Sequence, residues 1–312
     1  MNLKILLGQL DDGFFVPIIL CLRKIPLGKI AYKPMLYSLC MLRQFLNRPT
    51  SQHLRLLAPV CALPLFIMFS FFNRRPKEDV PEALALVADM HSHLLPGLDD
   101  GSDNIDESMD MIRTFIDRGF QRLYTTPHII HDFYPNGPET IAPALELVRQ
   151  AIAAEGLPVT IDAAAEYFLD EAFMDKITNK EPLMTFGDRY VLFETPFLNE
   201  PIYLRQVIFE LLTSGYKPVL AHPERYQYLF GKWAKIEELF DSGVLFQVNA
   251  MSLLGHYNKP SQDIAEKLVD KAMLHFIGTD CHKPKHQEIM KALPKLKSYK
   301  KALELPLLNR NI

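Results

Sequence analysis

The sequence carries residues able to bind a divalent metal ion close to position 90. His91 and His93 lie two residues apart and follow the apolar residues Leu86 and Val87. This order predicts a buried strand that ends in polar side chains. Because alternate residues of a strand face the same side, the two imidazoles should point together. Two neutral imidazoles with carboxylates nearby can hold a divalent ion.

This pair alone does not identify a metal site. Pro96, Gly97 and Gly101 end the predicted strand in a loop, and two histidines there can equally be ordinary surface chemistry. The residues at the ends of the later predicted strands decide between a metal site and two ordinary surface histidines.

Each later predicted strand also ends in a metal-capable or hydrogen-bonding residue. Histidines and carboxylates suit manganese, iron or zinc in an open catalytic site, whereas structural zinc prefers cysteines. Ten donors are too many for one ion and predict two or three. Such a group of ions can polarise a phosphoryl oxygen and supply hydroxide near neutral pH. The candidate donors are His91, His93, Asp99, Asp100, His128, Glu166, Glu194, His222, Asp280 and His282.

Seven strand-then-helix units are expected to position these side chains. Short apolar strands that alternate with helices indicate a parallel sheet. In β/α barrels the active site collects residues from the carboxyl ends of several strands, whereas an open doubly wound sheet gathers them near one switch point. The distribution here favours a closed or nearly closed barrel. The predicted strands after the first are residues 122–126, 159–165, 190–193, 218–221, 244–248 and 275–278.

Composition excludes several other classes of protein. The chain has 312 residues, 48% of them hydrophobic, and a net charge of −3. Without a basic stripe, nucleic-acid binding is not expected. The four cysteines form no CxxC pair, which suits a reducing compartment and predicts a cytoplasmic protein.

The first 88 residues differ in character from the rest. Asp11 and Asp12 are the only carboxylates before Glu78, and residues 56–72 form an uncharged stretch interrupted by prolines. A short membrane anchor over residues 56–75 is one interpretation, although a span of this length is at the short limit.

A start at Met68 is preferred, with no membrane association. It makes residues 1–67 a doubtful extension, 68–88 a linker and 89–312 the catalytic domain. N-terminal sequencing of the native protein would test this division.

Several motifs, in order along the chain, resemble the PHP (polymerase and histidinol phosphatase) superfamily. They are the segments 89–93, 126–128, 222–226 and 279–282, together with the strand ends at Glu166 and Glu194. LPGLDDG, AHPERY and QVNAMSLLG are most similar to the manganese-dependent tyrosine-protein phosphatases of bacterial capsule and exopolysaccharide loci. The resemblance covers about residues 86–290 and does not include residues 1–67.

The resemblance implies a distorted (β/α)7 TIM-like barrel with three metal ions. Glu166 would bridge the first two ions, and Asp99 is the alternative to Asp100 as a ligand of the third. Arg225 would bind the substrate phosphate, because a guanidinium can donate two parallel hydrogen bonds. The implied ligands are His91, His93, Glu166 and Asp280 for the first ion, Glu166, Glu194 and His222 for the second, and Asp100, His128 and His282 for the third.

The implied activity is manganese-dependent hydrolysis of phosphotyrosine in proteins, with iron or zinc as alternative metals. The implied substrate is a bacterial tyrosine kinase that controls polysaccharide synthesis or export. Two alternatives stay open. One is a small-molecule phosphatase of the histidinol-phosphate type, and the other is a non-catalytic metal-binding partner of an export complex.

The sequence departs from the related proteins after His282. They often carry an arginine a few residues on, where this chain has Lys283, Lys285 and His286. We expect Lys283 and Lys285 to supply charge to the substrate phosphate, without the bidentate geometry of an arginine. Cys281 has no arginine six residues later, so it is interpreted as a packed residue rather than a nucleophile.

Aromatic residues and an asparagine near the predicted site have open roles. Tyr226 and Tyr228 could contact an aromatic substrate or pack at the rim. Asn249 could hydrogen-bond a ligand or water. His256 and His275 are interpreted as structural.

Overall fold

The computed structural model describes residues 86–312. The stretch 56–75 and the predicted start at Met68 lie outside the described residues, so the predicted division of the chain stays a prediction. Within the described part, none of the helices is both long and apolar enough to cross a membrane.

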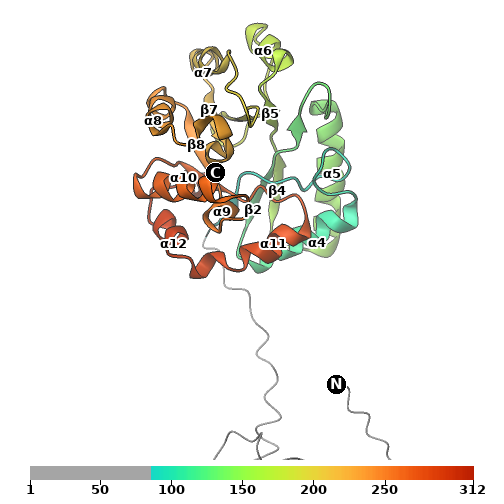
Figure 1. Cartoon of the computed structure of the whole chain (residues 1–312). Helices are drawn as coiled ribbons and strands as arrows, with labels where there is room; N and C mark the ends of the chain where they lie inside the picture. The colour runs from blue at the N-terminus through green and yellow to red at the C-terminus, as the bar shows by residue number, and fades with distance from the viewer. Residues whose placement is uncertain (1–85) are drawn as a thin grey trace, which may run out of the picture. The chain divides into compact units, whose positions relative to one another are not determined.

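Among residues 86–312, all strand pairs are parallel and form two sheets (Figure 1). The first sheet has the order β1 (Ala88–Asp89), β2 (Arg122–Thr125) and β4 (Thr160–Ala163). The second has the order β3 (His128–Ile129), β5 (Glu166–Phe168), β6 (Tyr190–Glu194), β7 (Lys217–Ala221), β8 (Leu245–Asn249) and β9 (Phe276–Gly278).

The two sheets follow one another around a distorted barrel. Only two residues separate β2 from β3, and two separate β4 from β5. Pro127 lies in the first gap and has no N–H to continue a ladder. Beyond β1 and β9, a parallel bridge joins Ser92 to Cys281, and the His93 N–H donates to the Cys281 carbonyl at 3.0 Å. The expected parallel α/β barrel-like fold is thus confirmed, and its distortion comes from these breaks.

Helices surround the strands (Figure 1). Asn104 accepts a hydrogen bond from the Glu107 N–H and begins α4. Near the end of the chain, a 3₁₀ turn that contains Pro294 separates α11 from α12. The helices are α4 (Ile105–Asp117), α5 (Pro138–Glu155), α6 (Glu171–Thr178), α7 (Leu204–Thr213), α8 (Trp233–Asp241), α9 (Ala250–Leu253), α10 (Lys259–Asp270), α11 (Pro284–Met290) and α12 (Lys297–Leu303).

An apolar cluster that includes strand residues Ala88, Leu192, Val219, Ala221 and Phe276 is fully buried. Because side chains alternate along a strand, the residue two positions after Leu192 shares its face of β6. That residue is Glu194, at the carboxyl end of the strand. The packed cluster therefore supports the polar side chains that follow it.

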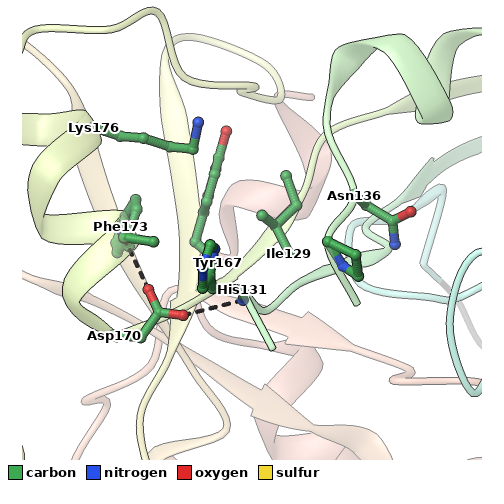
Figure 2. A pocket seen from close by; sticks show the side chains of 9 residues that line it. Ile129, His131, Asn136, Tyr167, Asp170, Phe173 and Lys176 are labelled. Carbon is green, nitrogen blue, oxygen red and sulfur yellow. Dashed lines mark hydrogen bonds between the residues drawn. The ribbon is translucent and has the colours of Figure 1, made fainter. Parts of the chain in front are cut away.

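A small cavity lies on the outer side of β3 and β5 (Figure 2). It has a volume of about 150 Å³, and its lining includes Ile129, Tyr167 and Phe173. Ile129 and Tyr167 pair with each other directly after the pair His128 and Glu166. By strand alternation they face away from those two residues, so this cavity is separate from the polar cluster described next.

Candidate metal centre

Two residues at the ends of strands have an unusual backbone. His222 follows β7 with φ of 32°, and Asp280 follows β9 with φ of 50°. The left-handed region costs a non-glycine residue on the order of 1–3 kcal/mol and is enriched at functional sites. Both strained residues belong to the predicted ligand set.

The predicted ligands of the first ion converge. His91 Nε2 lies 3.0 Å from Glu166 Oε2 and 3.5 Å from Asp280 Oδ1. His93 Nε2 lies 3.5 Å and 3.7 Å from the same two oxygens. All four residues are buried. The packing therefore brings together the two imidazoles that follow β1, the carboxylate that begins β5 and the carboxylate that follows β9.

Glu166 also contacts a second group of donors. Its other oxygen, Oε1, lies 3.1 Å from His222 Nε2, and His222 Nε2 lies 3.9 Å from Glu194 Oε2. His128 Nδ1 is 3.2 Å from Glu194 Oε1 and 3.3 Å from Glu166 Oε2. Oε2 of Glu166 thus faces His91 and His93, and Oε1 faces His222, which is the arrangement a bridging ligand needs.

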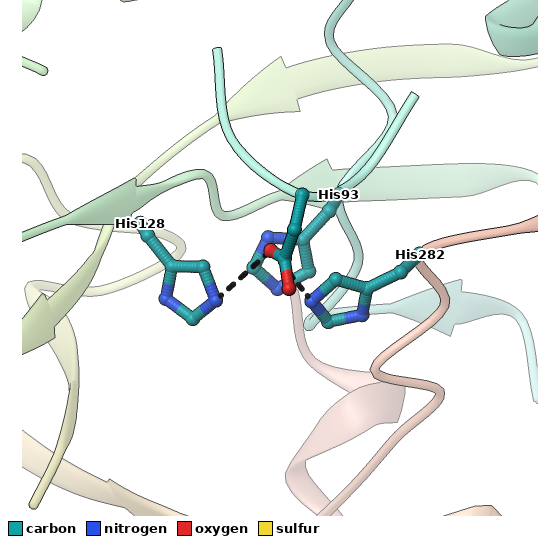
Figure 3. Close-up of side chains that lie close together, drawn as sticks. His93, His128 and His282 are labelled. Atoms are coloured by element: carbon teal, nitrogen blue, oxygen red, sulfur yellow. Dashed lines mark ion pairs between the residues drawn. The ribbon is translucent and has the colours of Figure 1, made fainter. Parts of the chain in front are cut away.

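A third group lies closer to solvent (Figure 3). Asp100 Oδ1 lies 3.4 Å from His282 Nε2 and 3.6 Å from His128 Nε2. The His282 ring also stacks on His93, with a centroid separation of 3.8 Å. The Asp100 side chain is 56% exposed, so this group stands at the mouth of the site.

The electrostatics of the cluster fit divalent cations. Burial lowers the pKa of His91, but the carboxylates of Glu166 and Asp280 outweigh it and raise that pKa to about 9. Burial also raises the pKa of Glu166, yet His91 and His128 hold it well below its usual range. The Glu166 carboxylate is therefore ionised and requires positive charge beside it.

Three sets of donor atoms in the described residues are compact enough for a metal ion. Within each set, all donor atoms lie within 4.8 Å of one another. The buried Nδ1 atom of His128 lies 3.2 Å from Glu194 Oε1 but has no partner in hydrogen-bonding geometry. Buried polar atoms without partners are uncommon and mark places where a ligand can be missing. The cluster is therefore capable of holding metal.

Comparison with known proteins places this arrangement in a family. The family model for capsular polysaccharide synthesis proteins CpsB/CapC matches residues 87–304. The chain belongs to the CpsB/CapC family.

Relatives within the CpsB/CapC family are named as tyrosine-protein phosphatases. The putative tyrosine-protein phosphatase CapC of Staphylococcus aureus is 31% identical over 227 residues, which are 72% of this chain and 89% of CapC. The tyrosine-protein phosphatase YwqE of Bacillus subtilis is 28% identical over 197 residues, which are 63% of this chain and 78% of YwqE.

A solved structure supports the same relationship. It comes from the work on YwqE of Bacillus subtilis and CpsB of Streptococcus pneumoniae, described as unique metal-dependent tyrosine phosphatases. The TM-score is 0.63 at 27% identity, and the match covers 72% of this chain and 94% of that one.

The structure of this CpsB/CapC member separates the roles of Asp99 and Asp100. The Asp99 carboxylate is bonded to His93 Nδ1 at 2.7 Å and accepts the backbone N–H groups of Gly101 and His128. Asp99 therefore orients the His93 imidazole through Nδ1, the ring nitrogen that does not face the donor cluster. Asp100, in contrast, faces His128 and His282 and completes the outer donor group.

We therefore expect substitutions of these two aspartates to differ. Asp100→Asn should remove the ion of the outer group. Asp99→Asn should lower the affinity for the ion beside His93 by roughly 10- to 100-fold, as is usual when the partner of a metal-binding histidine is changed. Metal content and affinity measured on both purified variants check this. Loss of the outer ion in Asp99→Asn alone would reverse the assignment.

Two buried amides support the donors, and only one was anticipated. Gln247 Oε1 is bonded to His91 Nδ1 at 2.9 Å and accepts the His222 N–H at 3.2 Å. Asn249 Nδ2 donates to Asp280 Oδ2 at 2.6 Å. Asn249 was proposed to contact a ligand, whereas Gln247 was missed. Its signal was an amide between apolar residues of the predicted strand, two positions before Asn249 and therefore on the same face.

Of the three predicted phosphate-binding residues, Arg225 lies in the site. Its Nη1 donates to Asp280 Oδ2 at 3.0 Å. Lys283 Nζ instead donates to Asp103 at 2.8 Å and lies 3.5 Å from Glu107, both near the start of α4. Lys285 is exposed on α11. The charge of Lys283 is therefore already partly neutralised.

The tyrosines at 226 and 228 are part of the scaffold. Tyr226 is fully buried, and its hydroxyl donates to the Ala221 carbonyl and accepts the Thr195 N–H. The Tyr228 hydroxyl bonds to the Thr195 side chain. They hold the ends of β6 and β7 together, so the alternative of a substrate contact is not supported by their positions.

Cys281 is buried, and burial raises the pKa of its thiol well above the usual value. A protonated, enclosed thiol is a poor nucleophile. This agrees with its interpretation as a packed residue.

Proposed function

We propose that this protein is a metal-dependent phosphatase that hydrolyses phosphotyrosine in proteins. The observation that carries the proposal is Glu166, whose two carboxylate oxygens face two donor groups with a third group beside them. The names of the relatives support the same activity. The cysteine usage fits a cytoplasmic location.

Manganese is the proposed metal, as two or three ions, with iron or zinc as alternatives. Imidazole and carboxylate donors without a thiolate suit these ions. When bound, the ions polarise the phosphoryl group and lower the pKa of water, which provides the nucleophile. The proposed ligands are His91, His93, Asp100, His128, Glu166, Glu194, His222, Asp280 and His282.

The protein's own groups position the substrate. Arg225 is proposed to bind the phosphoryl oxygens, with Lys285 and Lys283 adding positive charge at the rim. Asp280 accepts from Arg225 through Oδ2, while Oδ1 faces His91 and His93. The phenol of tyrosine has a pKa of about 10, so a phenolate is a better leaving group than an alkoxide. Its departure therefore needs less protonation by a general acid.

The proposed substrate is a phosphotyrosine-containing protein, in particular a bacterial tyrosine kinase that controls polysaccharide synthesis or export. The capsular polysaccharide description of the family supports this choice. The alternatives are a small-molecule phosphatase of the histidinol-phosphate type and a non-catalytic metal-binding partner of an export complex.

A substrate panel tests the proposal. The metal-loaded protein should have a kcat/KM at least about tenfold higher for phosphotyrosyl peptides than for histidinol phosphate, equivalent to about 1.4 kcal/mol of discrimination. The reverse preference would favour the small-molecule alternative. No turnover of either substrate by fully metallated protein would favour the non-catalytic one.

Metal affinity should increase with pH. In the metal-free protein, nearby carboxylates overcome burial and raise the pKa of His91 to about 9 and that of His128 to about 10. Both imidazoles are then protonated at neutral pH and must lose a proton to bind metal. Between pH 6 and 9, the apparent affinity should rise by about tenfold per pH unit for each proton released.

Metal titrations at pH 6, 7 and 8, with proton release followed by an indicator dye, measure this dependence. An affinity that stays constant across the range would contradict it.

A further inference from the structure

Two aromatic rings enclose the Arg225 guanidinium. Its Cζ lies 4.2 Å from the ring centroid of Tyr257 and 4.8 Å from that of Phe197. Phe197 lies in the loop after β6, and Tyr257 lies in the turn between α9 and α10. A cation over an aromatic face is attracted by the ring electrons. Two loops that are 60 residues apart in the chain therefore meet on one arginine.

Tyr257 is held in place by the polar network of the site. Its hydroxyl accepts from Asn249 Nδ2 at 3.1 Å and lies 3.4 Å from Asp280 Oδ2. The same Asp280 oxygen accepts from Arg225 Nη1 at 3.0 Å. One carboxylate oxygen thus fixes both the arginine and a ring that covers it, and Oδ1 stays directed at the histidines.

Most of the donors of Arg225 are not used by these contacts. A guanidinium has five N–H groups, and among the described residues only Asp280 accepts a hydrogen bond from it. The side chain is 24% exposed. The rings restrict the orientation of the guanidinium and leave several of its N–H groups available to an anion.

We propose that Phe197 and Tyr257 are positioning residues that hold Arg225 in a fixed orientation to receive the phosphoryl group. This inference rests on the proposed phosphatase function. An arginine that is free to rotate loses conformational entropy when it binds an anion, whereas one held between rings has already lost it. The two rings should therefore increase the affinity of the protein for phosphate, although neither ring contacts the phosphate.

The first test compares Tyr257→Leu with Tyr257→Phe in the full-length, manganese-loaded protein. The leucine variant should bind inorganic phosphate about tenfold more weakly by calorimetry, with a similar rise in KM for p-nitrophenyl phosphate and a smaller change in kcat. The phenylalanine variant keeps the ring and should lose far less. Equal losses in both variants would show that the hydroxyl matters and would overturn the proposal.

A double-mutant cycle with Arg225→Lys separates positioning from general packing. Lysine lacks the planar group that the rings hold, so Tyr257→Leu should cause little further loss in that background. A loss as large as in the wild-type background would mean that Tyr257 acts independently of Arg225 and would overturn the inference.

Phe240→Leu is the matched control. Phe240 is half-buried and stacks on His275 with a centroid separation of 5.2 Å, as Phe197 stacks on His222 at 5.7 Å. Phe197→Leu should weaken phosphate binding, and Phe240→Leu should not, at equal metal content and folded fraction. If the protein proves not to be a phosphatase, its affinity for inorganic phosphate still tests whether the rings position Arg225. Failure of the proposed activity and failure of the positioning role are therefore distinguishable.

Discussion

Glu166→Gln should lower kcat/KM for a phosphotyrosyl peptide by at least about 10³-fold, because metal-based charge stabilisation contributes several kcal/mol and each 1.36 kcal/mol is a factor of ten. Glutamine has nearly the same shape but no negative charge. It would leave His91 and His222 without their shared anionic partner, which contacts them at 3.0 Å and 3.1 Å. The two donor groups that Glu166 joins should both lose their ions.

Metal analysis of the variant makes this prediction specific. The outer group of Asp100, His128 and His282 does not need Glu166 to be complete, so one bound ion should remain. Glu155→Gln is the control, because Glu155 is an exposed carboxylate paired with Arg113 far from the site. A Glu166→Gln protein with a full complement of ions and near-normal turnover would refute the bridging role.

Removal of divalent ions by a chelator should likewise reduce activity by at least about 10³-fold, and added Mn²⁺ should restore it. Cys281 is enclosed and its thiol pKa is raised, so this thiol cannot replace an activated water as the nucleophile. The protein should remain folded after chelation, since carboxylate and imidazole pairs connect the strand ends without metal.

Activity, metal content and circular dichroism measured on the same chelated sample check this expectation. Comparing Mn²⁺, Fe²⁺ and Zn²⁺ in the restoration step identifies the metal that supports the highest kcat. Full activity in the presence of chelator would rule out the metal mechanism.

The structure distinguishes the proposed metal ligands from the residues that hydrogen-bond to those ligands and orient them. Asp99, Gln247 and Asn249 each bond a proposed ligand from behind. Such partners fix the tautomer and orientation of a metal-binding imidazole. The strained backbone at His222 and Asp280 fits the same picture, because the surrounding contacts must over-determine those two positions.

The sequence by itself determined the alternation of strands and helices and the chemical types of the donors, although it did not predict β3 and β5 as separate strands. Strand ends in a parallel barrel meet at one edge, so residues such as Glu194 and His128 could be placed together from periodicity alone. The role of Arg225, in contrast, is implied by the resemblance of the segment 222–226 to the PHP superfamily and not by periodicity. These features are local in the chain or follow from the regular repeat of a strand.

The tertiary structure alone decided the contacts made by loops. Loops have no period, so adjacent Asp99 and Asp100 could not be separated until their surroundings were known. The ion pair of Lys283 with Asp103 spans 180 residues. The rings of Phe197 and Tyr257 meet Arg225 only because the turns after β6 and α9 pack above the same strand end, and no spacing in the sequence records that packing.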